Sequence, residues 1–472
     1  MSSAETAAAR PVTVVVPVYG DLSTLVPCVE SLLANVDQSV HRVLLVNDCG
    51  PQVDEIEKTL LALIDGQSGF AYARNEKNLG FVGTCNRAAL ELDTTDNDIL
   101  FLNSDTITTP GFLEELSTVL HLSPQHGAVC PRSNNATIAS LPFTLRDPSV
   151  GRTMERTAAV HAALRDELPR FSIAPVAMGF CLLIRRDLIR GYGLFDEAFA
   201  PGYGEENDFC LRIRQHGFAS LIAHQALVFH VGGRSFVGGR REALRSAHEK
   251  LIVTRYPFYT EAVQSYIHVE RDPVDVYADA LVADETAPRA LIDLDREPTP
   301  WDLALLESAE RAVGDDFLVT VSVADHKAAR MSSRFPGLEV VAHSQLTGLW
   351  DVALACANVP SRGQLVRLNR VSPRWVLPRG ETEEFADIVV NYTGYSSAQA
   401  LLALRTDWAR FRVDRGSLRL RWSAITSDPD YLREASRSRE PRLSRLLRRA
   451  ESSAPRLVGW AKGAARQVIR GD

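Results

Sequence analysis

The sequence predicts an α/β protein whose first half folds into a mixed, mainly parallel sheet with helices on both faces. Residues 12–19 and 42–48 are two apolar, β-branched runs without polar alternation, as expected of strands that are buried on both faces. A helical pattern at 22–34 separates them, and strand and helix patterns keep alternating further along the chain. Such alternation indicates βαβ units, in which helices join parallel strands.

The remaining elements of the first half follow from the same patterns. Further strands are expected near 70–72, 98–105, 179–186, 220–223 and 227–230, and helices over 86–92, after Pro110, over 153–168 and from about Asn207 to Gly217. Residues 231–239 include four glycines. That density predicts a loop that can close over a ligand.

Length and charge limit the possible organisation and partners. At 472 residues the chain is too long for one ordinary core, so we expect a first domain over 1–265, a second α/β domain over 275–425 and a basic tail over 430–472. A formal net charge of -7 argues against nucleic acid as a partner, because binding to that polyanion normally needs a basic field.

Cysteine usage and hydropathy bear on location. The seven cysteines form no CxxC pair, so free buried thiols in a reducing compartment are expected. The first ten residues contain no apolar signal region, and no run of about 18 apolar residues occurs. We therefore expect a cytoplasmic protein whose membrane contact is at most peripheral.

Polar side chains are predicted to meet at one edge of the sheet. Tyr19, Asp48 and Asp105 each fall at the carboxyl end of an expected strand. Ligands of open α/β sheets bind outside these ends, so the three side chains point to a binding site. No GxGxxG follows the first strand, which argues against a dinucleotide-binding domain.

A cluster of acids opens another expected helix. Residues 202–217 begin with two glycines, place carboxylates at Glu205, Glu206 and Asp208, and continue into an amphipathic segment. Two interpretations are open at this point. The acids either stabilise the positive end of the helix as a cap, or one of them accepts a proton in a reaction.

Several short motifs between residues 12 and 236 resemble a known family when they are taken together. They are Pro17-Val18-Tyr19, Val46-Asn47-Asp48, Asn78-Leu79-Gly80-Phe81, Leu102-Asn103-Ser104-Asp105, Gly193-Leu194-Phe195-Asp196, Glu205-Glu206-Asn207-Asp208 with Arg212, and His230 before Ser235-Phe236. Their order and spacing resemble family 2 glycosyltransferases of the GT-A fold, of the bacterial polysaccharide type. The resemblance implies a Rossmann-like sheet and an inverting enzyme that moves a sugar from a nucleoside-diphosphate sugar to a hydroxyl of a glycan or a lipid-linked glycan.

The resemblance also implies roles for single residues. The donor nucleotide would be bound by Pro17, Val18, Tyr19, Asp48, Asn78, Gly80, Asn103 and Ser104. For Asp48, a local role as the cap of the next turn stays open. Asn103 departs from the family pattern, because it replaces the first Asp of the DxD motif and leaves Asp105 as the one direct carboxylate ligand for a cation.

The implied metal site joins Asp105 to His230. A hard cation held by a carboxylate, an imidazole and diphosphate oxygens is best matched by Mn2+ or Mg2+. A structural role for His230, as a lone histidine after an apolar strand, is the alternative.

The implied base is Glu206, with Glu205 as the close alternative. The second acid of the family's acidic pair is the one usually assigned to deprotonating the acceptor hydroxyl. Residues that would contact the acceptor or orient the base are Gly179, Phe180, Asp208 and Arg212.

Two other functions remain open from the sequence. A nucleotidyltransferase that makes a sugar nucleotide can use a similar sheet, but it would normally carry a basic, glycine-rich loop after the first strand, and residues 18–21 contain no basic residue. A catalytically inactive glycan-binding or scaffold protein is favoured by Asn103 and opposed by Asp105, Glu206 and His230.

The tail after about residue 430 alternates arginines with apolar residues. It is either a solvated extension or a basic amphipathic segment that lies on the anionic inner leaflet of the membrane.

Overall fold

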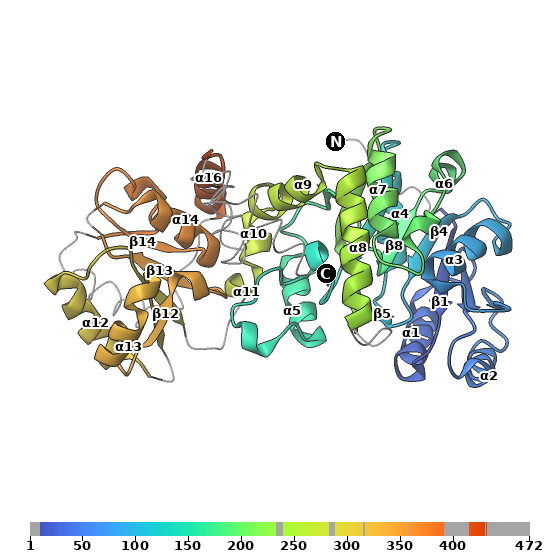
Figure 1. The fold of residues 1–472 in the computed structure, drawn as a ribbon, viewed down its shortest axis with the longest axis horizontal. Helices are drawn as coiled ribbons and strands as arrows, with labels where there is room; N and C mark the ends of the chain where they lie inside the picture. Colours follow the sequence, from blue (N-terminus) through green and yellow to red (C-terminus); the bar gives the residue numbers. More distant parts are fainter. Residues whose placement is uncertain are drawn as a thin grey trace, which may run out of the picture. The chain divides into compact units, whose positions relative to one another are not determined.

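The computed structural model describes residues 10–232, 239–282, 288–314, 317–357, 359–390, 415–429 and 431, without the side chains at 239–242 and 390. The chain divides into two compact units, Met1–Glu285 and Thr286–Asp472, which are treated separately below (Figure 1). Of the basic tail only Tyr431 is described, so the two interpretations of that segment fall outside the described residues.

The first unit contains a mixed sheet, as predicted. Its strands are β1 (Val12–Val18), β2 (Arg42–Asn47), β3 (Phe70–Arg74), β4 (Asp98–Leu102), β5 (Thr106–Thr108), β6 (His126–Arg132), β7 (Phe171–Ala174), β8 (Cys181–Ile184) and β9 (Ala219–His230). The order is β3-β2-β1-β4-β8-β6-β9-β5, with β7 beside β9. The first four strands of this order are parallel, and β8 is antiparallel to both of its neighbours. The apolar runs at 12–19 and 42–48 thus form β1 and β2, which have a neighbouring strand on each side and are largely buried.

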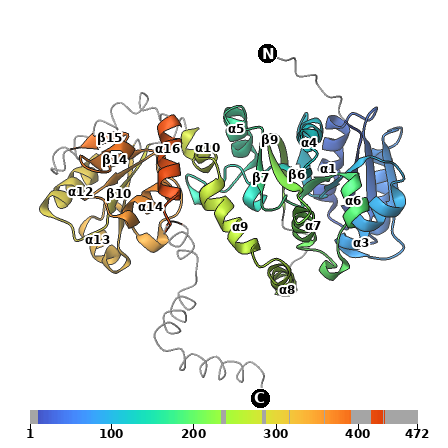
Figure 2. The same ribbon diagram turned by 90° about the horizontal axis from the view of Figure 1, so that it is seen from above.

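Helices cover both faces of this sheet. They are α1 (Leu22–Asn35), α2 (Val53–Leu63), α3 (Gly80–Arg87), α4 (Phe112–His121), α5 (Met154–Leu164), α6 (Arg186–Tyr192), α7 (Glu205–Arg214), α8 (Gly239–Arg255), α9 (Tyr259–Ser265), α10 (Pro273–Val276) and α11 (Ala278–Leu281). Figure 2 shows α4 and α5 on one side of β6 and β9, and α7 on the other side with α8 beyond it. The last turn of α3 continues as a π-helical segment over Ala88–Leu92.

Three details of the first unit differ from the sequence prediction. The helix expected from about Asn207 begins at Glu205, because Gly204 adopts φ 93° and lets the chain enter the helix two residues earlier. The segments 220–223 and 227–230 belong to one strand, β9, in which residues 224–226 form a bulge against β6. β6 itself was not expected as a strand, since prolines and polar residues interrupt its apolar pattern.

The helices after Tyr259 belong to the first unit through a buried charge cluster. Arg132 is completely buried and pairs with Asp275, which also accepts from Arg271 Nη1 at 2.5 Å. Burial by itself raises the pKa of Asp275, but the two guanidiniums lower it below its usual value. Apolar residues of α5, α10 and α11 pack together in a small core of their own.

In its described residues, the second unit contains a six-stranded parallel sheet. Its strands are β10 (Arg289–Leu294), β11 (Leu318–Val323), β12 (Glu339–Ala342), β13 (Val352–Ala355), β14 (Trp375–Pro378) and β15 (Ile388–Val390), in the order β12-β11-β10-β13-β14-β15. This is the order of a doubly wound Rossmann sheet. In Figure 1, α12 (Pro300–Ala312) and α13 (Ala328–Arg334) lie on one side of the sheet, and α14 (Arg362–Val371) and α16 (Arg415–Thr426) on the other.

Polar side chains at the carboxyl end of β10 bind one another. Asp293 is completely buried and accepts from Arg367 Nε and Nη2 at 3.1 and 3.0 Å, from Ser322 Oγ at 2.8 Å and from Gln364 Nε2 at 3.0 Å. This network joins α14 to the sheet at the point where the strand order reverses. The side-chain donors named here bind the carboxylate of Asp293.

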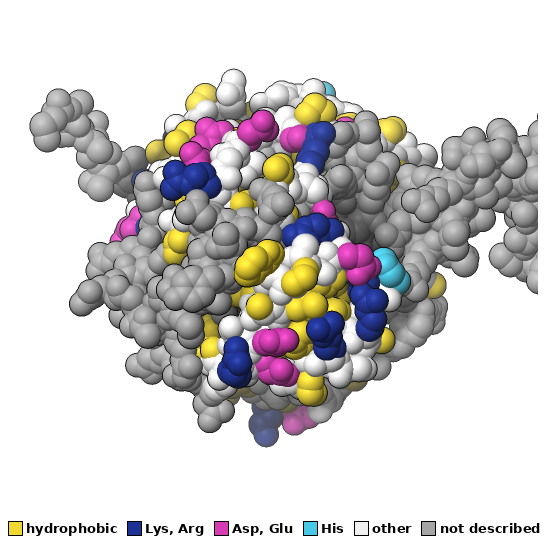
Figure 3. Space-filling view, turned by 90° about the vertical axis from the view of Figure 1, so that its left-hand side faces the viewer, with side chains coloured by type: hydrophobic (Ala, Val, Ile, Leu, Met, Phe, Trp, Pro, Cys, Tyr) yellow, Lys and Arg dark blue, Asp and Glu magenta, His cyan; other side chains and the backbone are white. Residues whose placement is uncertain are grey.

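Surface composition agrees with the mixed charge of the sequence. On the face in Figure 3, Lys and Arg side chains lie among Asp, Glu and hydrophobic ones, so the described atoms form no broad area of a single sign there. Within the described part of the chain, no helix has the length and apolar character needed to cross a membrane. All seven cysteines are free, and all except Cys49 are buried.

Candidate active site

A cavity of about 1030 Å³ opens at the carboxyl ends of β1, β2 and β4 in the first unit. The sequence-predicted residues that line it are Pro17, Val18, Tyr19, Asp48, Asn78, Gly80, Asn103, Ser104, Asp105, Gly179, Phe180, Glu205, Glu206 and His230. Asp208 and Arg212 are not part of its wall. Segments that are as far apart in the sequence as Pro17 and His230 therefore meet at the sheet edge where the sequence predicted a site.

Asp48 lies directly after β2 and is buried. Its Oδ1 accepts from the backbone N of Leu79 at 2.7 Å and from Asn75 Nδ2 at 2.8 Å. The carboxylate thus holds the loop before α3 in place while it faces the cavity. The local and the ligand-binding interpretations of Asp48 are compatible, because one oxygen carries the loop contacts.

The loop that Asp48 holds is packed tightly against a second turn. Gly80 has φ 73°, and a Cβ atom there would lie 2.7 Å from Cβ of Pro201. The backbone N of Phe81 donates to the carbonyl of Pro201 at 2.7 Å. Asn78 Oδ1 accepts from the backbone N of Gly80 at 2.9 Å. Only glycine fits this position without strain, and Gly80 and Pro201 both line the cavity.

Asp105 and His230 come together through strand pairing. β5 follows Asp105 and pairs with the end of β9, so that Thr106 lies opposite His230. Asp105 Oδ1 is 3.4 Å from His230 Nε2. His230 Nδ1 lies 2.7 Å from the carbonyl of Asn135, and the ring stacks on Phe180 with 5.3 Å between centroids. An Nδ1–H donated to that carbonyl leaves Nε2 as the nitrogen that faces Asp105.

This pair fits a divalent cation. One carboxylate oxygen and one imidazole nitrogen lie 3.4 Å apart, both from residues that line the cavity. A histidine ligand whose other nitrogen donates to a carbonyl is the usual arrangement at metal sites. Burial lowers the pKa of His230, but the hydrogen bond and charge of Asp105 raise it above its usual value overall. No third His, Cys, Asp or Glu completes a metal cluster among the described residues, so diphosphate or water oxygens would have to supply the other ligands.

Asn103 and Ser104 lie in the short connection between β4 and β5. The backbone N of Asn103 donates to the carbonyl of Phe180 at 2.9 Å, and its own carbonyl accepts from Thr106 Oγ1 at 2.8 Å. These backbone bonds fix the connection in which Asp105 follows. Asn103 therefore lines the cavity with an amide where the DxD pattern has a carboxylate.

Glu205 and Glu206 occupy the first turn of α7 and differ in exposure. Glu206 is half-buried, its Oε2 accepts from the backbone N of Gly204 at 3.2 Å, and a Cβ atom on Gly179 would lie 3.1 Å from its Cγ. Glu205 is only 5% exposed, and within the described part of the chain its Oε2 has no hydrogen-bond partner.

The pKa values of the two carboxyls are raised to different degrees. Burial, with the neighbouring charge of Glu206, raises the pKa of Glu205 well above its usual value. Burial also raises the pKa of Glu206, while backbone N–H groups and the charge of Arg245 lower it. Backbone N–H groups lower the pKa of Glu205 as well, but of the two carboxylates Glu206 has the greater solvent access and the positive charge of Arg245.

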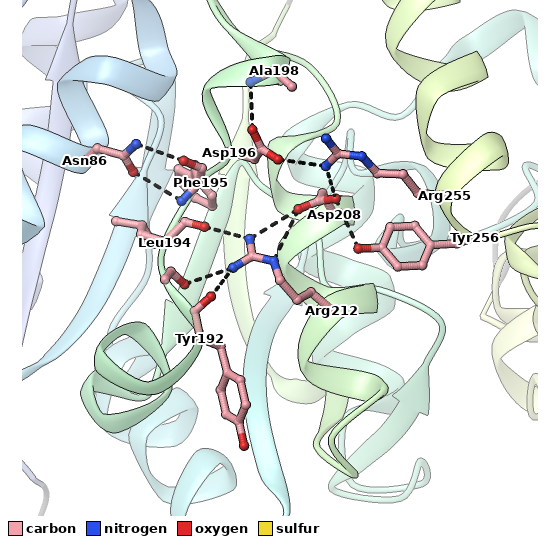
Figure 4. A network of polar contacts seen from close by, with 11 residues as sticks. Asn86, Tyr192, Leu194, Phe195, Asp196, Ala198, Asp208, Arg212, Arg255 and Tyr256 are labelled. Atoms are coloured by element: carbon pink, nitrogen blue, oxygen red, sulfur yellow. Dashed lines mark hydrogen bonds and ion pairs between the residues drawn. The ribbon is translucent and has the colours of Figure 1, made fainter.

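Asp208 and Arg212 form a separate hub behind α7 (Figure 4). Asp208 accepts from Arg212 Nη2 at 3.2 Å, from Arg255 Nη1 at 2.8 Å and from Tyr256 Oη at 3.1 Å. Arg212 also donates to the carbonyls of Tyr192, Gly193 and Leu194. This hub joins α7 to α8 and to the C-terminal end of α6. Both residues are therefore structural supports and not part of the cavity wall.

One wall of the cavity comes from α8 and α9, which the sequence did not indicate. Arg245, His248, Glu249 and Ile252 of α8 and Tyr259 of α9 line it. His248 Nδ1 lies 3.1 and 2.8 Å from the carbonyls of Gly202 and Tyr203. No local motif marks these positions, because the helix has an ordinary mixture of charged and apolar residues. Its residues reach the cavity only because α8 packs against the start of α7.

Comparisons with known proteins include a match to a family model. A family model described as glycosyltransferase like family 2 matches residues 9–248. Among curated protein sequences, none matches the chain significantly.

Similar solved structures are distant in sequence. A structure of GalNAc-T7 with UDP, GalNAc and Mn2+ is 14% identical over 56% of this chain, with a TM-score of 0.40, and the match spans 51% of that protein's chain. The mannosyltransferase PcManGT from Pyrobaculum calidifontis, in complex with GDP-Man and Mn2+, is 15% identical over 57% of this chain and 71% of its own, with a TM-score of 0.39. TarS 1-349 of S. aureus, in complex with UDP-GlcNAc, is 12% identical over 58% of this chain and 82% of its own, with a TM-score of 0.36.

Proposed function

Because the chain belongs to the glycosyltransferase-like family 2, we propose that it transfers a sugar from a nucleoside-diphosphate sugar to an acceptor hydroxyl, with inversion at the anomeric carbon. One observation carries the proposal. Asp48, the pair of Asp105 and His230, and Glu206 all line the same cavity. A nucleoside contact, a metal pair and a base are the groups that such a displacement requires.

The donor would lie across the carboxyl edge of the sheet. Asp48, at the end of β2, can accept a hydrogen bond from a base N–H or a ribose hydroxyl, and Asn78, in the loop that Asp48 holds, also lines the cavity. Asn103 and Ser104 lie between this end and Asp105, where the diphosphate would pass. Asp105 and His230 would hold the divalent cation, which when bound neutralises charge on the departing diphosphate.

Glu206 would act on the acceptor. It accepts the proton of the acceptor hydroxyl as that oxygen forms its bond to the anomeric carbon, while the bond from this carbon to the diphosphate oxygen breaks and the electron pair leaves with the nucleoside diphosphate. Glu205 is the weaker candidate, because its burial favours the protonated form and leaves little room for an acceptor. Gly179 supports the assignment to Glu206, since a side chain there would press on the glutamate.

The charge of the cavity favours a diphosphate donor over a nucleotidyltransferase substrate. Six carboxylates line it, and Arg245 is the one Lys or Arg among the described lining residues. A triphosphate would normally be held by a basic, glycine-rich loop after β1, whereas here that position carries Asp21, which caps α1.

The decisive experiment measures donor binding and turnover separately. Thermal-shift screening against UDP-, dTDP- and GDP-sugars, with and without Mn2+, should give one donor class that stabilises the protein. With that donor, Glu206→Gln should abolish transfer and retain the thermal shift. Wild-type turnover in this variant would refute the base assignment, and the absence of a shift with every donor would favour a non-catalytic scaffold.

The metal pair has its own test. Asp105→Ala and His230→Ala should each weaken the Mn2+-dependent part of the donor shift, because each removes one of two protein ligands. If the Mn2+ dependence of the thermal shift were unchanged in either variant, that residue would not be a metal ligand and its role would be structural.

We also propose a glycan or lipid-linked glycan as the acceptor and the inner membrane leaflet as the place of contact for residues 430–472. The family resemblance supports the first statement and the arginine-rich composition the second. Flotation with anionic vesicles, with and without the residues after 430, tests the membrane contact; equal flotation would contradict it.

A further inference from the structure

Helix α8 is fixed against the start of α7 at several points. His248 contacts the carbonyls of Gly202 and Tyr203 in the turn that leads into α7. One turn later, Ile252 is buried where it faces Gly204. At the end of the helix, Arg255 binds the carboxylate of Asp208. The first turn of α7, which carries Glu206, therefore faces a wall whose position is set by these contacts.

Arg245 lies on this wall, one turn before His248. Its side chain is exposed and lines the cavity that Glu206 also lines. No hydrogen bond or ion pair joins it to another residue in the described part of the chain, which sets it apart from the paired Arg212 and Arg255. It is thus a cation on the wall of an acidic cavity, without a structural partner among the described residues.

Backbone N–H groups of the first turn of α7 favour the ionised form of Glu206, whereas the side chains around it other than Arg245 disfavour a charged carboxylate. On its own helix, Glu205 and the buried thiol of Cys210 lie close. From α9, Tyr259 faces it, and the pKa of Tyr259 is raised by burial and by the charge of Glu206. From α8, Glu249 places a negative charge near Tyr259, and His248 is occupied by backbone carbonyls.

We propose that Arg245 is a positioning residue whose guanidinium is the counter-charge that keeps Glu206 ionised and ready to accept the acceptor proton. This proposal rests on the proposed function of Glu206 as the base. The direction of the electrostatic effect agrees with it, because the charge of Arg245 lowers the pKa of Glu206 against the effect of burial. The size of the effect is limited by solvent, since an exposed guanidinium is partly screened.

The first test is the pH profile of turnover with the donor that gives the largest thermal shift, with water as the acceptor. Arg245→Gln should move the acid limb of the profile upward by about half a pH unit and leave the rate at high pH near that of the wild type. Arg245→Lys keeps the positive charge, so its acid limb should lie close to the wild-type position. Lys250→Gln is the matched control, because it removes a positive charge from an exposed position of α8 that does not line the cavity. An acid limb that stays in place, or a rate that falls equally at every pH, would overturn the proposal.

The second test does not depend on turnover and so separates this proposal from the proposed function. Thermal unfolding is compared for the wild type, Arg245→Gln, Glu206→Gln and the double variant at pH 5 and pH 8. Loss of Arg245 should lower the unfolding temperature by about 1–2 °C at pH 8, less at pH 5, and not at all in the Glu206→Gln background. An effect of Arg245→Gln that persists in that background would refute the coupling, whether or not any nucleotide sugar is turned over.

Discussion

Replacement of Asp208 by Asn tests whether the hub behind α7 supports the active site. The carboxylate is 2% exposed and receives donors from Arg212, Arg255 and Tyr256. Asparagine keeps the volume and removes the charge, so both guanidiniums lose their shared counter-charge. The effect should be a loss of stability in the first unit, without a direct effect on any group that touches a ligand.

The magnitude follows from the exposure of the partners. Removal of one member of a fully buried ion pair costs about 3–5 kcal/mol. Here the Arg212 and Arg255 side chains are 24% and 32% exposed, and each keeps other acceptors, namely three carbonyls for Arg212 and Asp196 for Arg255. Water and these acceptors offset part of the loss, so we expect about 2–3 kcal/mol, or about 5–10 °C in the unfolding temperature of this unit.

Calorimetric unfolding gives the size of the effect, and hydrogen exchange of peptides from α7 and α8 shows where it acts. Asp196→Asn is the matched control, because that carboxylate also binds Arg255 but is 39% exposed and should cost about 1 kcal/mol or less. The reasoning would be wrong if Asp208→Asn were within about 0.5 kcal/mol of the wild type or could not be told apart from the control.

Three further predictions follow from buried groups. Burial raises the pKa of Glu205 on folding, so its ionisation costs stability as the pH rises above the unfolded value of about 4.3; Glu205→Gln should therefore become increasingly stabilising in thermal unfolding between pH 5 and pH 8, and a pH-independent difference would contradict this. Asp293→Ala leaves Arg367 without its main counter-charge and should destabilise the second unit by about 3 kcal/mol in denaturant unfolding, whereas a loss below about 1 kcal/mol would show that the network is dispensable. Among the thiols, Cys49 should react first with an alkylating reagent at pH 8, as mass spectrometry of the modified peptides would show, because the other six are buried; faster labelling of another cysteine would disprove it.

The sequence was most informative where function and local pattern coincide. Asp48, Asp105 and Glu206 each end a strand or begin a helix, and the sheet topology alone brings such positions to one edge. Apolar runs such as 12–19 predicted the central strands because burial on both faces leaves no polar alternation. The class of fold and the motif-bearing side of the cavity could therefore be predicted.

The rest depends on tertiary packing that leaves no local signal. Arg245 and His248 belong to a helix with an ordinary charge pattern, and only its contact with the turn before α7 brings them to the cavity. The sequence alone also could not distinguish the roles of the adjacent residues Glu205 and Glu206, since the difference between them is burial. Strand β6 was missed because its polar residues, including Arg132, are paired inside the fold and not with solvent.

The buried pairing of Arg132 with Asp275 decides where the first unit can be cut. Arg132 sits at the end of a strand in the main sheet, yet its partner comes from α10, well beyond the last residue that lines the cavity. A fragment truncated after α9 would keep every proposed catalytic side chain and leave a guanidinium enclosed without an anion, which favours aggregation or partial unfolding over activity. Any separately expressed first unit should thus extend through Leu281, the end of α11. The segment after α9 then supplies the carboxylate that neutralises Arg132 and holds this segment against the sheet.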